Sequence, residues 1–281
     1  LPLAVDLIAD IVQHATIDPE ELQREQSVIV QEIHQAHDTP DDVVFDHFQE
    51  TAFPSQALGR PVLGTEETVR GFTRDDLIVY RRDHYTAANT VLAASGRIDH
   101  DDLVALATEA FDAMPVQTNG VVEGARYAGG DFRGERDLEQ VHLVLGYEGV
   151  AYDDEDFYAA SVMSTLFGGG MSSRLFQEVR EKRGLVYAIY SFVSSYKDGG
   201  VFGIYAGTGA NEVAELMPVI CDEIAKLADG VDEAETARSR AQLKASILMG
   251  RESTSSRAEQ LARQLMVFGR PLPVDEIVAG I

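Results

Sequence analysis

Residues 185–209 read LVYAIYSFVSSYKDGGVFGIYAGTG, and this stretch decides the fold class. Both halves are rich in the β-branched and aromatic residues that strands favour, and Asp198-Gly199-Gly200 between them is a turn signal. We therefore expect an antiparallel hairpin turned at these three residues. Residues 140–149, QVHLVLGYEG, have a similar composition and predict a further strand.

Helical patterns follow these strands. Residues 154–169 and 211–230 carry apolar residues at helical spacing, and Gly230 suits the end of the second helix. Strands and helices mixed in this way, together with a hairpin, favour the α+β class. We expect an antiparallel-rich sheet with helices on one face.

A weak internal repeat indicates duplication. Residues 91–114 and 201–228 each read as a strand, a glycine-bearing turn and a long amphipathic helix, so we expect two homologous α+β domains. The stretch from 115 to about 138 is rich in Gly, Asn and charge and lacks a period, which is typical of a linker. The predicted division is a first domain at 1–118, a linker at 119–138 and a second domain at 139–281.

The first part of the chain alternates helical and strand patterns. Expected helices lie at 3–14, about 19–37, 39–53, 73–85 and 99–114, with a strand at 89–96. Asp18-Pro19-Glu20 supplies an N-cap, an N1 proline and an early acidic residue, and Thr39-Pro40 repeats these signals. Leu1 opens inside an amphipathic pattern and VDEIVAGI ends inside an apolar one, so we expect both ends to be cut from something longer.

The composition narrows the classes of function. The 281 residues are 45% hydrophobic and 25% charged, and their formal net charge is −24. Such an acidic surface repels nucleic acid and anionic membranes, and no apolar run approaches the roughly 20 residues of a membrane span. One cysteine, Cys221, excludes an intrachain disulfide and a cysteine-based metal cage, and we expect it to be a small buried residue. A reducing compartment fits: bacterial cytoplasm first, periplasm or mitochondrial matrix as alternatives.

Residues 24–38, REQSVIVQEIHQAHD, contain the first candidate site. Glu25 and Glu32 are seven positions apart, hence about 20° apart around a helix axis. They fall along one edge of an apolar stripe made of Leu22, Ile29, Ile33 and Ala36. We expect both carboxylates to be half-buried, where a cation or a hydrogen-bond partner becomes necessary. A metal ligand with an accessory acid is one interpretation, and an ordinary solvated helix edge is the other.

Two histidines follow on the same predicted helix. His34 and His37, three apart, can share a helix face as metal ligands do, but no glutamate lies between them to act as a base. Neither His-Glu-x-x-His nor His-x-x-Glu-His occurs anywhere in the sequence. We therefore expect no catalytic zinc pair at these histidines, and the sequence lacks a complete metallopeptidase site.

The second candidate site lies in residues 167–190, FGGGMSSRLFQEVREKRGLVYAIY. Gly168–Gly170 permit positive φ and a close backbone approach, and the serines after them can cap a helix continuing through Arg180. No Gly-Lys-Ser/Thr is present, so this is not a phosphate loop. Arg180 can bind a carbonyl or carboxylate in a fork, and Tyr187 can donate to a carbonyl. The alternative is a helix-end arginine and a core tyrosine.

The segment GGGMSSRLFQEVREKRGLVY resembles the second-domain signature of the M16 metallopeptidases, the insulinase, pitrilysin and mitochondrial processing peptidase group. Further segments agree with the family in order: PEELQREQSVIVQEIHQAHDTPDDVVFDHFQETAF, ALGRPVLGTEETV and HYTAANTVLAASGRIDHDDLV. The resemblance runs across the whole chain and is strongest to the bacterial processing-peptidase-type members.

The resemblance implies an inverzincin, a protease built around His-x-x-Glu-His and Zn²⁺. REQSVIVQE matches the family's third zinc ligand as Glu32 and its accessory catalytic glutamate as Glu25. REKRGLVY matches the arginine and tyrosine of the second domain as Arg180 and Tyr187, which would hold the substrate and the developing oxyanion. The implied partners are a peptide, presequence or unfolded polypeptide substrate and a second M16-like subunit, in a homodimer or heterodimer.

One departure from the family is large. Its histidine motif lies roughly seventy residues before the ligand glutamate, whereas 31 residues precede Glu32 here. We therefore expect an N-terminally truncated first domain, a second domain incomplete at its C-terminus, and a fragment that is inactive and binds zinc weakly or not at all. The full-length parent would be a zinc metalloendopeptidase. Alternatives are a non-catalytic M16-like partner that binds peptide or scaffolds an active subunit, and an unrelated α+β protein with HQAH as a minor metal site.

Overall fold

The computed structural model describes residues 1–117 and 122–281. Residues 118–121, at the start of the predicted linker, lie outside the described residues. The chain divides into two compact units, and neither is one continuous segment. Unit 1 comprises Leu1–His34, Leu63–Glu123 and Met249–Pro271, and unit 2 comprises Gln35–Val62, Gly124–Leu248 and Leu272–Ile281. The domain boundaries proposed from the sequence stay a prediction.

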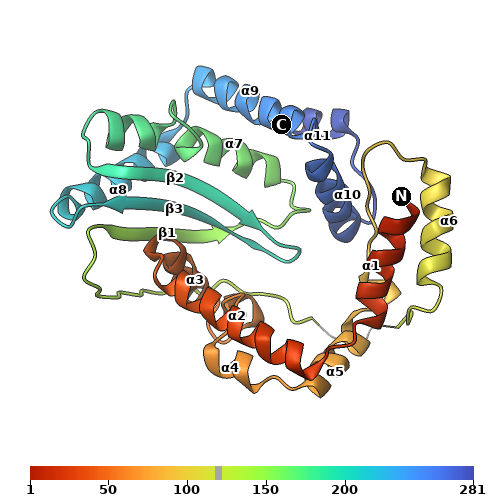
Figure 1. The fold of residues 1–281 in the computed structure, drawn as a ribbon. Helices are drawn as coiled ribbons and strands as arrows, with labels where there is room; N and C mark the ends of the chain where they lie inside the picture. The colour runs from red at the N-terminus through yellow and green to blue at the C-terminus, as the bar shows by residue number, and fades with distance from the viewer. Residues whose placement is uncertain (118–121) are drawn as a thin grey trace. The chain divides into compact units, whose positions relative to one another are not determined.

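Helices and a small antiparallel sheet make up the described residues, which confirms the α+β class (Figure 1). The α-helices are α1 (Pro2–His14), α2 (Pro19–His37), α3 (Pro40–Ala52), α4 (Glu66–Gly71), α5 (Arg74–His84), α6 (His100–Phe111), α7 (Phe157–Gly168), α8 (Val213–Asp229), α9 (Glu233–Gly250), α10 (Thr254–Phe268) and α11 (Val274–Gly280). Short turns are η1 (Ala57–Gly59), η2 (Ala87–Asn89) and η3 (Phe176–Glu181). The strands are β1 (Val141–Gly149), β2 (Val186–Ser195) and β3 (Gly200–Thr208).

The sheet of unit 2 has the order β1-β3-β2, and both neighbouring pairs are antiparallel. β2 and β3 form the hairpin predicted from the sequence, paired from Ser195 and Gly200 onward. At the turn, the Tyr196 amide donates to the Gly199 carbonyl at 2.7 Å. β3 is therefore the central strand, and its residues are almost all buried.

The main core of unit 2 lies where α7, η3 and α8 pack on one face of this sheet (Figure 1). Fully buried side chains in it include Phe167, Leu175, Ile204, Leu216 and Ile220. Each such side chain contributes roughly 1.5–3 kcal/mol relative to exposure. This core fixes β2 and η3, the two elements that carry Arg180 and Tyr187.

α7 and β2 approach each other closely at Gly168. A Cβ added there would overlap the Ser191 backbone nitrogen and lie 2.6 Å from its Oγ. The Ser191 hydroxyl donates to the Ser164 carbonyl at 2.7 Å, which ties the helix to the strand. The three consecutive glycines therefore provide close approach, as expected. None of Gly168–Gly170 has positive φ.

α3 packs on the opposite face of the sheet. A Cβ added at Gly146 of β1 would overlap the Phe48 ring of α3. The Phe45 ring also meets the Phe192 ring edge-on, with centroids 5.6 Å apart. Residues before the predicted linker thus cover the sheet that follows it.

In unit 1, α2 begins at the predicted cap: the Asp18 carboxylate accepts hydrogen bonds from the Glu20 and Glu21 amides at 2.8 and 3.3 Å. Two side chains of α5 bind the loop between α1 and α2: Arg74 and Arg81 donate to the carbonyls of residues 15–17. In α1 the Gln13 amide donates to the Ala110 carbonyl of α6 at 2.8 Å.

Three expectations are wrong. Residues 89–96 end η2 and then run without secondary structure, because no described strand offers them a ladder partner. The Thr39 hydroxyl donates to the Gln35 carbonyl at 2.9 Å instead of capping α3. Cys221 is exposed, since the buried face of α8 is formed by Leu216, Val219, Ile220 and Glu223.

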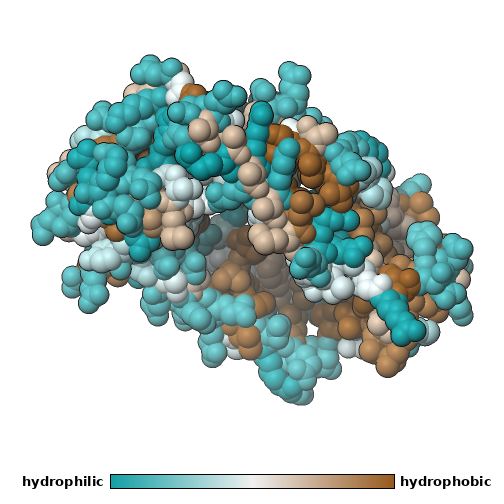
Figure 2. Space-filling model, turned by 90° about the horizontal axis from the view of Figure 1, so that it is seen from above, coloured by the Kyte–Doolittle hydropathy of each residue, from teal (hydrophilic) through white to brown (hydrophobic). Residues whose placement is uncertain are grey.

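The surface is mixed in character. Figure 2 shows hydrophilic side chains over much of the visible face, with hydrophobic ones among them. No described helix is both long enough and apolar enough to cross a bilayer.

Candidate functional site

The buried face of α2 is centred on Gln26, Val30 and Ile33. Val30 and Ile33 pack against Val69 of α4. The Gln26 amide donates to the carbonyls of Val69 and Phe72, both at 2.9 Å. These contacts fix how α2 is rotated about its axis, and so which residues face solvent.

Glu25 and Glu32 are exposed, so the expectation that they are half-buried is wrong. The predicted stripe of Leu22, Ile29, Ile33 and Ala36 is buried or half-buried, but the buried face also extends to Gln26 and Val30, on the side away from the two glutamates. The two carboxylates still lie about 20° apart on one side of the helix. Within the described part of the chain, neither makes a hydrogen bond or an ion pair. Both remain available to an external ligand.

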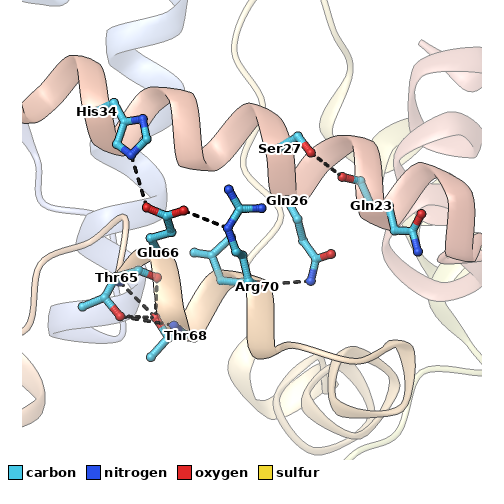
Figure 3. A network of polar contacts seen from close by, with 9 residues as sticks. Gln23, Gln26, Ser27, His34, Thr65, Glu66, Thr68 and Arg70 are labelled. Atoms are coloured by element: carbon cyan, nitrogen blue, oxygen red, sulfur yellow. Dashed lines mark hydrogen bonds and ion pairs between the residues drawn. The ribbon is translucent and has the colours of Figure 1, made fainter.

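His34 lies in a surface cluster of polar side chains with Glu66 and Arg70. Its Nε2 lies 3.3 Å from a Glu66 carboxylate oxygen, and the other oxygen accepts from Arg70 Nε at 2.8 Å (Figure 3). The hydrogen bond from Arg70, followed by that from His34, lowers the pKa of Glu66 below its ordinary value of 4.5. His37 is exposed, and its backbone carbonyl accepts from Arg136 at 2.8 Å. No group of three His, Cys, Asp or Glu residues suited to a metal occurs among the described residues.

Arg180 lies in the π-helical segment η3. The Ser173 hydroxyl accepts from the Phe176 amide at 3.4 Å, so the predicted serine cap is present. No pattern in these residues predicted the wider π-helical winding, a geometry found often at functional sites. The Arg180 guanidinium lies 4.9 Å from the centre of the Phe176 ring, and the side chain is exposed. A cation on a ring face keeps its N–H donors free for other partners.

Tyr187 belongs to a β-bulge at the start of β2. Val186 pairs with Thr208 and Ala188 with Gly207, so Tyr187 is the extra residue in the ladder. Its side chain is 65% exposed, which excludes the core tyrosine considered from the sequence. Bulges re-aim side chains and are frequent beside active sites.

Unit 2 contains an open groove between α3 and β1. Its volume is about 520 Å³, and residues 127–138 line its third side. Neither Arg180 nor Tyr187 lines this groove. A second, polar cavity of about 550 Å³ lies beside the ion pair of Arg174 and Glu235, which are 2.7 Å apart.

The four predicted residues fall into two pairs. Glu25 and Glu32 lie in unit 1, on one side of a single helix. Arg180 and Tyr187 lie in unit 2, on consecutive elements. The first pair presents oxygen acceptors and the second presents N–H and O–H donors. Their catalytic roles stay a prediction.

Two family profiles match the chain. The profile described as "Peptidase M16 inactive domain" matches residues 71–243. The profile described as "Insulinase (Peptidase family M16)" matches residues 1–66.

Curated relatives are similar across nearly all of the chain. An "uncharacterized zinc protease" of Rickettsia felis is 37% identical over 98% of this chain and 67% of its own length. One from Streptomyces coelicolor is 38% identical over 100% of this chain and 63% of its own length. The zinc protease YmxG of Bacillus subtilis is 36% identical over 98% and 68%, respectively. The chain therefore spans about two thirds of the length of these relatives.

Solved structures share the fold at lower identity. The M16 inactive domain from Pseudomonas fluorescens gives a TM-score of 0.84 at 22% identity, over 99% of this chain and 70% of that one. A protease from Helicobacter pylori gives 0.85 at 20% identity, over 99% and 72%. A chain of Complex III2 from Candida albicans gives 0.86 at 23% identity, over 100% and 70%. On the profile matches and the zinc protease relatives, this chain belongs to the M16 (insulinase) family of peptidases.

Proposed function

We propose that this chain is part of a zinc-dependent endopeptidase in which Glu32 is a metal ligand, Glu25 an accessory acid, and Arg180 and Tyr187 bind the peptide. One observation carries the proposal. The four side chains that match the M16 pattern are all exposed, and in the described residues no hydrogen bond or ion pair engages their polar groups. Polar groups left free at matched positions are suited to binding something else.

The donor chemistry of Glu32 suits zinc, because carboxylate oxygens bind this ion at about 2.0–2.2 Å. The described residues do not complete the ligand set, since they hold no group of three suitable side chains. The sequence also contains no His-x-x-Glu-His. Two imidazole ligands and the general base would come from other residues of the full-length protein. A zinc ion bound there would polarise the scissile carbonyl and activate water.

The role proposed for Arg180 and Tyr187 is substrate binding. The Arg180 guanidinium can grip a peptide carbonyl or carboxylate in a fork, and the Tyr187 hydroxyl can donate to a carbonyl oxygen. Donors of this kind hold the peptide in register and stabilise the oxyanion that develops on it. The net charge of −24 favours basic, presequence-like peptides. We further propose a homodimer or a heterodimer with another M16-like subunit, in the cytoplasm of a bacterium.

The test uses the full-length gene product and measures both bound zinc and cleavage of a basic fluorogenic peptide. Glu32→Gln should remove the zinc and lower cleavage by about 100-fold or more, because a carboxylate ligand is lost. Glu21→Gln is the matched control: Glu21 lies on the same helix, is exposed, and pairs with Arg24. It should change neither quantity.

Arg180→Ala and Tyr187→Phe should keep full zinc and lower kcat/KM by roughly 10- to 100-fold, because they remove donors to the substrate. Retention of full zinc by Glu32→Gln would refute the ligand assignment. A full-length protein that holds no zinc and cleaves nothing, yet binds the peptide through Arg180, would instead be the non-catalytic partner considered from the sequence.

A further inference from the structure

The last residue of β3, Thr208, is fully buried, with 0% of its surface exposed. Its Oγ1 donates a short hydrogen bond of 2.5 Å to the Leu185 carbonyl. Thr208 lies at the end of the central strand, paired with Val141 of β1 on one side and Val186 of β2 on the other. A buried hydroxyl needs a partner, and this one has the backbone oxygen immediately before β2.

That carbonyl lies directly before the bulge. Val186 is opposite Thr208 and Ala188 is opposite Gly207, so two steps along β2 match one step along β3. Tyr187 is therefore left outside the ladder, and its direction depends on how the flanking residues are held. On the N-terminal side of Tyr187, the hydrogen bond from the Thr208 hydroxyl fixes the backbone at Leu185.

The residues between η3 and β2, which include Leu185, also join Arg180 to the sheet. Gly184 has φ of +64°, and its amide donates to the Arg180 carbonyl at 3.0 Å. The Leu185 amide donates to the Val179 carbonyl at 3.1 Å. Both of these bonds are between backbone groups, so a substitution cannot delete them cleanly. The hydrogen bond from the Thr208 hydroxyl to the Leu185 carbonyl comes from a side chain, so a substitution can remove it.

We propose that Thr208 is a positioning residue for Tyr187 and, through the same connection, for Arg180. The importance of these two side chains rests on the proposed function, but the hold exerted by Thr208 is measurable without it. Loss of the hydroxyl frees the Leu185 carbonyl and loosens the backbone from which Tyr187 leaves the sheet. The hydroxyl then acts on the peptide only through Tyr187 and Arg180.

Two substitutions separate the hydroxyl from the shape of the side chain. Thr208→Val keeps a β-branched side chain of nearly equal size and removes the donor. Thr208→Ser keeps the donor and removes a methyl group. Thr165→Val is the matched control, because the Thr165 hydroxyl also donates to a backbone carbonyl, that of Ser161 at 2.9 Å, but within α7.

In the full-length protein, Thr208→Val should lower kcat/KM for the basic peptide about tenfold at unchanged zinc content, as expected for a misplaced binding group. Thr208→Ser should restore at least half of the activity, and Thr165→Val should match the parent. In a background carrying both Tyr187→Phe and Arg180→Ala, Thr208→Val should cost less than about twofold, because the two groups through which Thr208 acts are already removed. Additive losses would overturn the proposal.

Hydrogen exchange measured by mass spectrometry on the same full-length proteins gives a readout independent of cleavage. Peptides covering residues 180–188 should exchange faster in Thr208→Val than in the parent, Thr208→Ser or Thr165→Val. Unchanged exchange there would overturn the hold by Thr208, whatever the kinetics. If the full-length protein cleaves nothing, the proposed function fails, and the exchange comparison alone still supports or overturns the hold.

Discussion

Replacing Gly146 with alanine should destabilise unit 2, although alanine is ordinarily the better strand residue by roughly 0.5–1 kcal/mol. The added Cβ would overlap Cε2 and Cζ of the Phe48 ring and lie 3.4 Å from Cδ2. Carbon atoms prefer separations of about 3.5–4.0 Å, so the Phe48 ring would have to move by more than about 1 Å. Forcing a methyl group into such a contact costs about 1–3 kcal/mol.

The cause can be isolated by removing the ring. Phe48→Ala alone should cost about 2 kcal/mol, below the 3–5 kcal/mol of a fully buried phenylalanine, because Phe48 is only half-buried. In the Phe48→Ala background, Gly146→Ala should cost nothing or stabilise slightly, so the two changes are coupled by about 2 kcal/mol. Gly199→Ala is the control, because a Cβ there would meet no atom within 4 Å.

Urea unfolding followed by circular dichroism on the parent, the two single variants, the double variant and the control gives the five free energies. A change in free energy of about 2 kcal/mol also corresponds to a shift in Tm of roughly 4–8 °C for a domain of this size. If the two substitutions proved additive, α3 would not rest on β1 at this glycine, and the packing described for that face would be wrong.

The remaining predictions concern charged and ionisable groups. Glu235→Gln should cost roughly 1–3 kcal/mol at neutral pH, because the pair with Arg174 is largely buried, with side chains 15% and 25% exposed. The hydrogen bond from Arg174 lowers the pKa of Glu235 below 4.5. The stabilisation that the ionised Glu235 contributes is therefore present above pH 4.5 and is lost as the pH falls through the lowered pKa. Urea midpoints of the parent and the variant, measured from pH 7 to pH 3, should converge as the pH falls. Arg70→Ala should return the pKa of Glu66 toward 4.5 more than His34→Ala does, as read by carboxyl NMR titration. Burial, with a smaller effect of Asp41, raises the pKa of Tyr205 from 10 to about 12. The contribution of Tyr205 to stability should therefore be constant below pH 10 and disappear as the pH rises toward 12. Tyr205→Phe should abolish this loss of stability at alkaline pH.

Local signals in the sequence predicted the elements that depend on local chemistry. The Asp18 cap of α2 and the hairpin turn predicted at Asp198-Gly199-Gly200 both formed where capping and turn residues stand. Each depends on hydrogen bonds between neighbours in the chain. Such signals can be recognised in the sequence without knowledge of the tertiary fold.

Features set by distant partners were not predictable. Residues 89–96 have the composition of a strand, but a strand also needs a partner, which no composition reveals. The rotation of α2 depends on Gln26 reaching carbonyls more than forty residues away, and this placed Glu25 and Glu32 on the exposed side. The bulge at Tyr187 arises from the register between β2 and β3, which one strand's sequence does not record.

The position of α3 has a practical consequence for cloning. A fragment starting at residue 139 would contain all three strands but leave out Phe45 and Phe48, which cover Phe192 and the glycine side of β1. Such a fragment should aggregate or bind hydrophobic dyes, because an apolar sheet face would meet water. Residues 35–62 supplied as a separate polypeptide should bind to it and restore solubility, as in fragment complementation.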